Sequence, residues 1–182
     1  MKAIKNLIII LWILPIITNA QRYITKTAKI SFFSNAPLEN IKAENNQVNA
    51  ALDLSNGDIT LRVLMKSFEF EKEKMQEDFN ENFLFTNKYP NASFDGKITN
   101  FHDININREE TVNVNVEGNL TIKGISKKII AKGTISVKNG TLDISSKFII
   151  ILKNFNVKVP NTLIKNISEN IEISVNGTLK KI

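Results

Sequence analysis

Apolar and polar residues alternate along most of this chain. In VNVNVEG, Val112, Val114 and Val116 alternate with polar residues, and the same period of two recurs at residues 48–52, 59–65, 142–144 and 171–175. This period is typical of strands with one buried face. The Asn-Gly pairs at 56–57 and 139–140 are favoured hairpin turns. The pattern predicts an all-β fold, an antiparallel barrel or sandwich of about eight or nine strands.

Two segments depart from this alternation. FEFEKEKMQEDFNENFLF, residues 68–85, contains five of the 11 phenylalanines, and helical spacing places Phe68, Met75, Phe79 and Phe83 on one stripe. We expect one amphipathic helix near residues 69–83, lying on a sheet face or across the mouth of a barrel. FIIIL, residues 148–152, is apolar on both faces, so its outer side or its end should be covered.

Three glycines lie among the alternating residues of the later strands. Gly118, Gly124 and Gly133 are spaced singly. Glycine inside a strand pattern often marks a bulge or a tight bend. We therefore expect bulges or bends that close a barrel, and no loop that cradles a phosphate.

Residues 1–20 have the pattern of a secretory signal peptide. Lys2 and Lys5 precede an apolar stretch at residues 7–17, and Thr18, Asn19 and Ala20 follow it. We expect cleavage after Ala20. Residues 21–182 would then form one domain, periplasmic or secreted.

The composition argues against an enzyme. The chain has no cysteine and one histidine, which excludes a disulfide framework, a thiol nucleophile and a thiolate metal site. His102 has no visible catalytic or metal-binding partner, and no Gly-x-Ser-x-Gly motif is present. We therefore expect no catalytic residue, no metal ligand and no cofactor. A hydrolase or isomerase that uses His102 with a carboxylate is the alternative.

The basic charge does not indicate a nucleic-acid partner. The net charge is +6, but the lysines are scattered singly and do not alternate with aromatic platforms. A transient contact with an anionic membrane surface is compatible with this charge.

The remaining candidate activity is binding of an apolar ligand. An eight-stranded barrel is either filled by its own side chains or holds one ligand, and the alternation alone does not distinguish the two. Phe68, Met75, Phe79 and Phe83 of the predicted helix are candidate ligand contacts. The inward strand candidates are Phe32, Leu61, Val63, Val114 and Ile173.

Residues 36–98 resemble the central part of the YceI-like family, in a subgroup of small exported members. MKSFEFEKEKMQEDFNEN and KYPNASFDGKI carry the resemblance, and GNLTIKGISKKI, residues 118–129, is similar to a later family motif. The resemblance implies a lipocalin-like barrel whose mouth is covered by the helix and which holds a polyisoprenoid-type lipid, without catalysis. Many relatives have an acidic residue and a histidine in the first strand, whereas YITKTAKISFF, residues 23–33, has neither.

These observations predict non-enzymatic binding, transport or sequestration of a long apolar lipid in the cell envelope. The alternative is a filled barrel that acts as an envelope interaction protein without a ligand.

Overall fold

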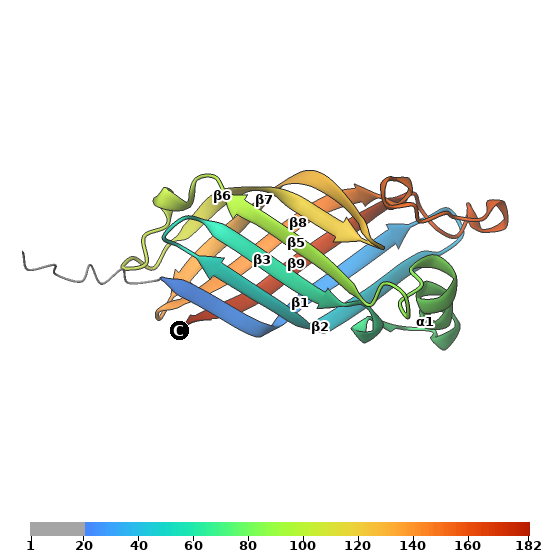
Figure 1. Ribbon diagram of the computed structural model, residues 1–182, viewed down its shortest axis with the longest axis horizontal. Coiled ribbons are helices and arrows are strands. Elements are labelled where there is room, and N and C mark those ends of the chain that lie inside the picture. Colours follow the sequence, from blue (N-terminus) through green and yellow to red (C-terminus); the bar gives the residue numbers. More distant parts are fainter. Residues whose placement is uncertain (1–20) are drawn as a thin grey trace, which may run out of the picture.

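The computed structural model describes residues 21–182 and shows a closed antiparallel barrel (Figure 1). The predicted signal peptide lies outside the described residues. Eight strands form the barrel in the order β1-β9-β8-β7-β6-β5-β3-β2, and pairing of β1 with β2 closes it. The strands are β1 (Arg22–Asn35), β2 (Asn40–Asp53), β3 (Asp58–Leu64), β5 (Asn91–Ile98), β6 (Thr111–Ile122), β7 (Ile125–Lys138), β8 (Thr141–Ile151) and β9 (Asn170–Lys181). The lipocalin-like barrel predicted from the sequence is confirmed.

The alternation defines which side chains enter the barrel. Val114 of β6 is 4% exposed, whereas its neighbours Asn113 and Asn115 are exposed. The β7–β8 turn has positive φ at both Asn139 (48°) and Gly140 (74°), as in the turns that match strand twist.

Gly124 forms a tight bend as expected, but Gly118 and Gly133 do not form bulges. The pairing of β6 with β7 runs in unbroken register, and Gly118 faces Gly96 of β5. A Cβ atom at either of these facing glycines would collide with the Phe94 ring. Glycine is therefore needed for the close approach of an aromatic ring, which an alternation pattern does not reveal.

The helical segment begins later than predicted. Glu69–Phe70 forms the short strand β4, which pairs with Ala43 and Glu44 of β2, and α1 spans only Glu73–Asp78 before a π-helical turn at Phe79–Phe83. The Phe-Glu alternation at residues 68–71 has the period of a strand and prevails there over the helical stripe. Phe68 therefore precedes the helix and is not part of it.

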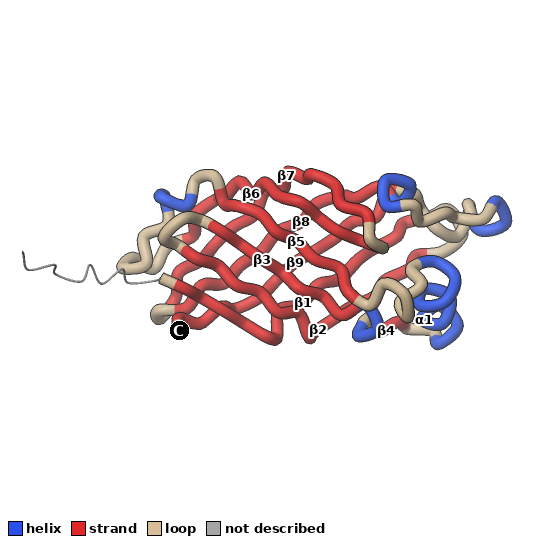
Figure 2. Tube along the Cα trace, viewed as in Figure 1, coloured by secondary structure: helices blue, strands red, loops and turns tan. Residues whose placement is uncertain are grey.

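The barrel has two different ends. Around the start of β1 and the end of β9, the interior is filled by side chains that are at most 2% exposed: Tyr23, Val48, Leu52, Val137, Leu142 and Leu179. We call this the filled end. At the opposite end, the open end, lie α1 and the segment 152–169, which contains the short 3₁₀ turns η4 (Leu152–Phe155) and η5 (Asn161–Leu163) (Figures 1 and 2). The helices found within residues 21–182 are too short and too polar to cross a bilayer.

Candidate functional site

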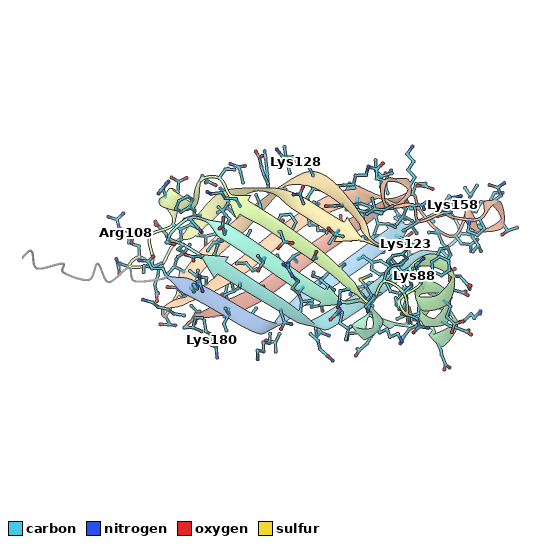
Figure 3. The ribbon with its side chains drawn as sticks, viewed as in Figure 1. Lys88, Arg108, Lys123, Lys128, Lys158 and Lys180 are labelled. Atoms are coloured by element: carbon cyan, nitrogen blue, oxygen red, sulfur yellow. The ribbon has the colours of Figure 1, made fainter. Side chains whose placement is uncertain are left out.

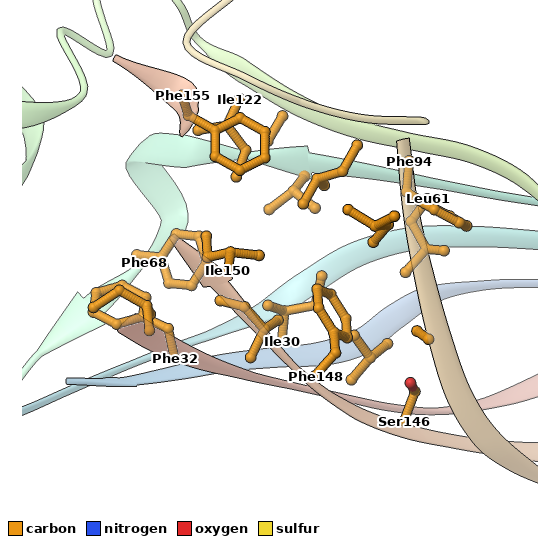
Figure 4. Close-up of a pocket in the computed structure, with 18 of the residues that line it drawn as sticks. Ile30, Phe32, Leu61, Phe68, Phe94, Ile122, Ser146, Phe148, Ile150 and Phe155 are labelled. Atoms are coloured by element: carbon orange, nitrogen blue, oxygen red, sulfur yellow. The ribbon is translucent and has the colours of Figure 1, made fainter. Parts of the chain in front are cut away.

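An apolar cavity of about 330 Å³ lies inside the barrel and extends to the open end. Ligand pockets in proteins usually measure about 300–1,000 Å³. Inward residues of the strands line it, together with residues of the helical segment and of segment 152–169 (Figure 4). The sequence left a filled or a hollow barrel equally open, and the structure shows a filled end together with a cavity inside the same barrel.

Every ligand-contact candidate named from the sequence lines this cavity. The lining residues include Phe68, Met75, Phe79 and Phe83 from the helical segment and its approach, and Phe32, Leu61, Val63, Val114 and Ile173 from the strands. The structure therefore brings all nine together. That they contact a ligand remains a prediction.

Four phenylalanines form a cluster at the mouth of the cavity. The Phe79 ring lies 5.7 Å from Phe32, 5.6 Å from Phe68 and 5.1 Å from Phe70, measured between ring centroids. Such offset and edge contacts each stabilise a pair by about 0.5–1.5 kcal/mol beyond burial. Phe79 thus connects the helical segment to the barrel wall through rings alone.

The π-helical turn aims Phe79 and Phe83 at the cavity. The Leu84 amide donates to the Phe79 carbonyl at 2.9 Å, and the buried Thr86 hydroxyl donates to the Asn80 side-chain oxygen at 2.9 Å. The first bond spans five residues and so widens the last turn. The second fixes the chain where it leaves the helix. We call residues 73–84 the lid.

Segment 152–169 covers the other side of the mouth and was not predicted to do so. Phe155 is 2% exposed and Val157 3% exposed, and both line the cavity with Leu163. Phe155, Val157 and Val159 alternate with polar residues, a period that would indicate a further strand, but the structure forms a 3₁₀ turn and a loop there. The apolar run at 148–152 predicted a cover over its outer side or its end. Its outer side is open at Ile149, which is 66% exposed, and segment 152–169 follows its end.

The geometry can be compared with known proteins. The sequence model of one protein family, the YceI-like domain, matches residues 23–179. This chain belongs to the YceI-like family.

Solved structures share the YceI-like barrel at low sequence identity. A polyisoprenoid binding domain from Saccharophagus degradans superposes with a TM-score of 0.77 at 11% identity, covering 90% of this chain and 99% of that one. Burkholderia cenocepacia BcnA gives 0.63 at 17% identity, with coverage of 84% and 95%. The Campylobacter jejuni YceI protein gives 0.61 at 19% identity, with coverage of 81% and 88%. No curated protein matches the chain significantly.

One carboxylate links the two segments that cover the mouth of the YceI-like barrel. Glu39, in the β1–β2 turn, accepts hydrogen bonds from the Lys72 ammonium at 2.6 Å and from the Asn166 side-chain amide at 3.4 Å. The Lys72 bond lowers the pKa of Glu39, against a smaller opposing effect of burial. Glu39 therefore joins the start of the lid to segment 152–169.

Lysines surround the open end on the side of the β6–β7 turn (Figure 3). The Lys123 ammonium donates to the Asn156 carbonyl at 3.1 Å and lies 4.5 Å from the centre of the Phe85 ring. Burial lowers the pKa of Lys123, against a smaller opposing effect of Tyr89, and the charge of Lys158 also lowers it. Lys123 thus connects the β6–β7 turn to the residues that follow η4.

His102 lies outside the cavity of the YceI-like barrel. It belongs to the 3₁₀ turn η3 (Phe101–Asp103), which lies toward the filled end, and its side chain is exposed with its ring 3.9 Å from that of Phe101. The hydrolase or isomerase alternative requires this imidazole and a carboxylate to converge inside the cavity. The structure places it elsewhere.

Proposed function

We propose that this YceI-like protein binds a long apolar lipid of the polyisoprenoid type and carries or sequesters it in the cell envelope, without catalysis. The observation that carries the proposal is the apolar cavity closed by the Phe79 cluster. The fold shared with a solved structure described as a polyisoprenoid binding domain supports it. The envelope location rests on the signal-peptide pattern of residues 1–20, with cleavage after Ala20.

The cavity suits a hydrocarbon chain because it offers apolar contact on almost every side. Burying apolar surface contributes about 25 cal/mol per Å², or about 0.8 kcal/mol for each methylene group. A branched isoprenoid chain can therefore be held without a polar contact. Glu39 and Asp78, the charged residues that line the cavity, both belong to its rim elements, the β1–β2 turn and the lid.

The cavity favours a ligand over the filled-barrel alternative. Close packing leaves few voids larger than a water molecule in a natural interior. An apolar cavity of about 330 Å³ is costly unless something occupies it. A chain that enters this space would recover the lost contacts.

Native mass spectrometry of protein purified from its own envelope tests the proposal. The expected mass exceeds that of the chain beginning at Gln21. Organic extraction should release the bound molecule that accounts for the difference, and it should be an apolar lipid. Protein that has been unfolded, extracted and refolded without lipid serves as the control. A native protein with the mass of the bare chain would contradict the proposal.

A further inference from the structure

Two neighbouring strands of the barrel separate before they end. Pairing of β7 with β8 stops at Gly133 and Ser146. Nevertheless β7 stays paired with β6 as far as Ile125, and β8 stays paired with β9 as far as Ile151. Residues 125–132 and 147–151 therefore form two facing strand edges without a ladder between them. We call this region the β7–β8 seam. On the β8 side alone it extends about 16 Å, at about 3.3 Å per residue.

The inner side of the seam is cavity wall. Ile129 and Ala131 of β7, and Phe148 and Ile150 of β8, all line the cavity. Figure 4 shows Ser146 and Phe148 beside the cavity on this side. The seam is thus a lateral boundary between the cavity and the outside.

Two side-chain hydrogen bonds and the turn η4, which contacts both strands, bridge the seam. The Ser146 hydroxyl donates to the Lys132 carbonyl at 2.8 Å where the strands diverge. The Lys123 ammonium bonds to the Asn156 carbonyl near the opposite limit. Single exposed hydrogen bonds of this kind contribute about 0.5–1.5 kcal/mol each. Separating the edges therefore costs far less than breaking a strand ladder.

The outer side of the seam exposes one isoleucine from each strand. Ile130 is 68% exposed and Ile149 is 66% exposed. Each lies three residues beyond the last paired rung, Gly133 with Ser146, so the two flank the seam on the outer face of their strands. Both isoleucines therefore present apolar surface outside the barrel, beside strand edges that no neighbouring strand covers.

Lysines alternate with these isoleucines on the same outer rows. Lys128 and Lys132 flank Ile130, and Lys147 precedes Ile149, all with exposed side chains. Glu117 pairs with Lys128 at 3.1 Å and Glu172 with Lys147 at 2.8 Å, and β7 itself contains four lysines and no acidic residue. Glu117 and Glu172 thus neutralise Lys128 and Lys147, whereas Lys127 and Lys132 are exposed and form no ion pair within the described residues. The surface is therefore apolar at its centre and keeps a net positive charge on its β7 side. That combination is complementary to the interface of an anionic bilayer.

We propose that the β7–β8 seam docks on an anionic bilayer surface and that the apolar chain passes sideways between β7 and β8. The inference rests on the proposed function, since it concerns the route by which the same cavity is loaded. Unpaired backbone groups cannot enter hydrocarbon, so the seam stays at head-group depth and only Ile130 and Ile149 reach the acyl boundary. The head groups and water hydrogen-bond the two strand edges while they are apart.

Vesicle sedimentation without any isoprenoid tests the docking. Wild-type protein should sediment with phosphatidylcholine–phosphatidylglycerol vesicles. The affinity of I130E/I149E for these vesicles should be lower by about tenfold or more, because two apolar contacts are replaced by charges that the anionic surface repels. L38E/I164E is the matched control. Leu38 and Ile164 are 68% and 57% exposed at the open end, and the Leu38 amide bonds to the carbonyl of Lys165. This control should bind like the wild type.

Several results would overturn the docking. They are wild-type protein that ignores the anionic vesicles, I130E/I149E that binds like the wild type, and L38E/I164E that loses binding in place of the seam variant. The last result would assign the contact to the mouth. Because all four altered side chains are more than half exposed, the melting temperatures should remain those of the wild type.

A reversible cross-link tests the passage. The chain has no cysteine, so I130C/I149C can be bridged by a short bis-thiosulfonate reagent and released by reductant. A fluorescent polyprenol is then added to vesicles of the same phospholipids. Its uptake by the bridged protein should slow by about tenfold or more and recover on reduction. Equal uptake in both states would overturn the passage. Wild-type protein that never takes up the polyprenol would contradict the proposed function and the passage together, whereas the isoprenoid-free vesicles decide the docking separately.

Discussion

The filled end and the open end are built from the same strands, yet only one contains a cavity. At the filled end Tyr23, Leu142 and Leu179 are at most 2% exposed and fill the space between the strands. At the open end the wall includes Ala131 and Gly133, and the four clustered rings around Phe79 lie at the mouth. Alternation therefore specifies a barrel, whereas the volumes of the inward side chains determine which part of it is hollow.

Removing bulk from the filled end should have the largest effect on stability. Leu142 is fully buried and does not line the cavity. Leu142→Ala should lower the free energy of unfolding by about 2–5 kcal/mol, measured by urea denaturation. The lipid bound per folded molecule should stay at the wild-type level. A variant of normal stability that has lost its lipid would contradict the division into a filled end and an open end.

Adding bulk should affect the two ends in opposite ways. Val137→Phe at the filled end should cost about 1–3 kcal/mol of stability, because the core there has no room. Val114→Phe enters the cavity, so it should leave the stability nearly unchanged and reduce the retained lipid severalfold. Urea denaturation and lipid extraction on both variants separate these outcomes. Equal loss of stability in the two variants would show that the open end is also filled.

Glu39, which links the two segments over the mouth, should have a smaller effect on the melting temperature, and this effect should depend on pH. The Lys72 hydrogen bond lowers the folded-state pKa of Glu39, so its contribution to stability is present above the usual pKa of a glutamate and is lost as the pH falls through the folded pKa. Glu39→Gln should lower the melting temperature at pH 7 by about 2 °C or less, since the pair is partly exposed. The difference should disappear as the pH falls from about 5 toward 3. A difference that persists at the acidic limit would mean that Glu39 acts through packing.

The smallest effect is expected at His102, outside both the cavity and the filled core. His102→Ala should change the free energy of unfolding by less than about 0.5 kcal/mol and leave lipid retention unchanged. Thermal melting and lipid extraction check both. A large loss of lipid would restore a functional role for the imidazole.

Much of the barrel could be predicted because its strands have one wet face. Val112, Val114 and Val116 alternate with polar residues, and the turn at Asn139-Gly140 is coded locally. The helical stripe led to Met75, Phe79 and Phe83, all of which line the cavity. These features depend on local periodicity, which a sequence displays directly.

The remaining features depend on contacts between distant segments. Phe155 and Val157 close the mouth from a run that alternates like a strand but pairs with none, and Gly118 makes room for a ring on another strand. The end of β7–β8 pairing at Gly133 likewise has no local signal. Such features become visible only when the barrel is closed, because they depend on which side chains meet across it.

The most direct test of the central claim is Phe79→Asp, measured for retained lipid and melting temperature on the same preparation. Phe79 lines the cavity and contacts three other rings, so a charge there should draw water into the mouth and reduce the retained lipid about tenfold or more. Strand pairing holds the barrel, so the circular dichroism spectrum should stay β-rich. Phe85→Asp is the matched control. Phe85 follows the lid, is 45% exposed and does not line the cavity, and its φ of 50° suits aspartate better than phenylalanine.

The account predicts loss of lipid in Phe79→Asp and wild-type lipid in Phe85→Asp. Unchanged lipid in Phe79→Asp beside a collapsed melting temperature would contradict it, because the lid would then pack on a filled core.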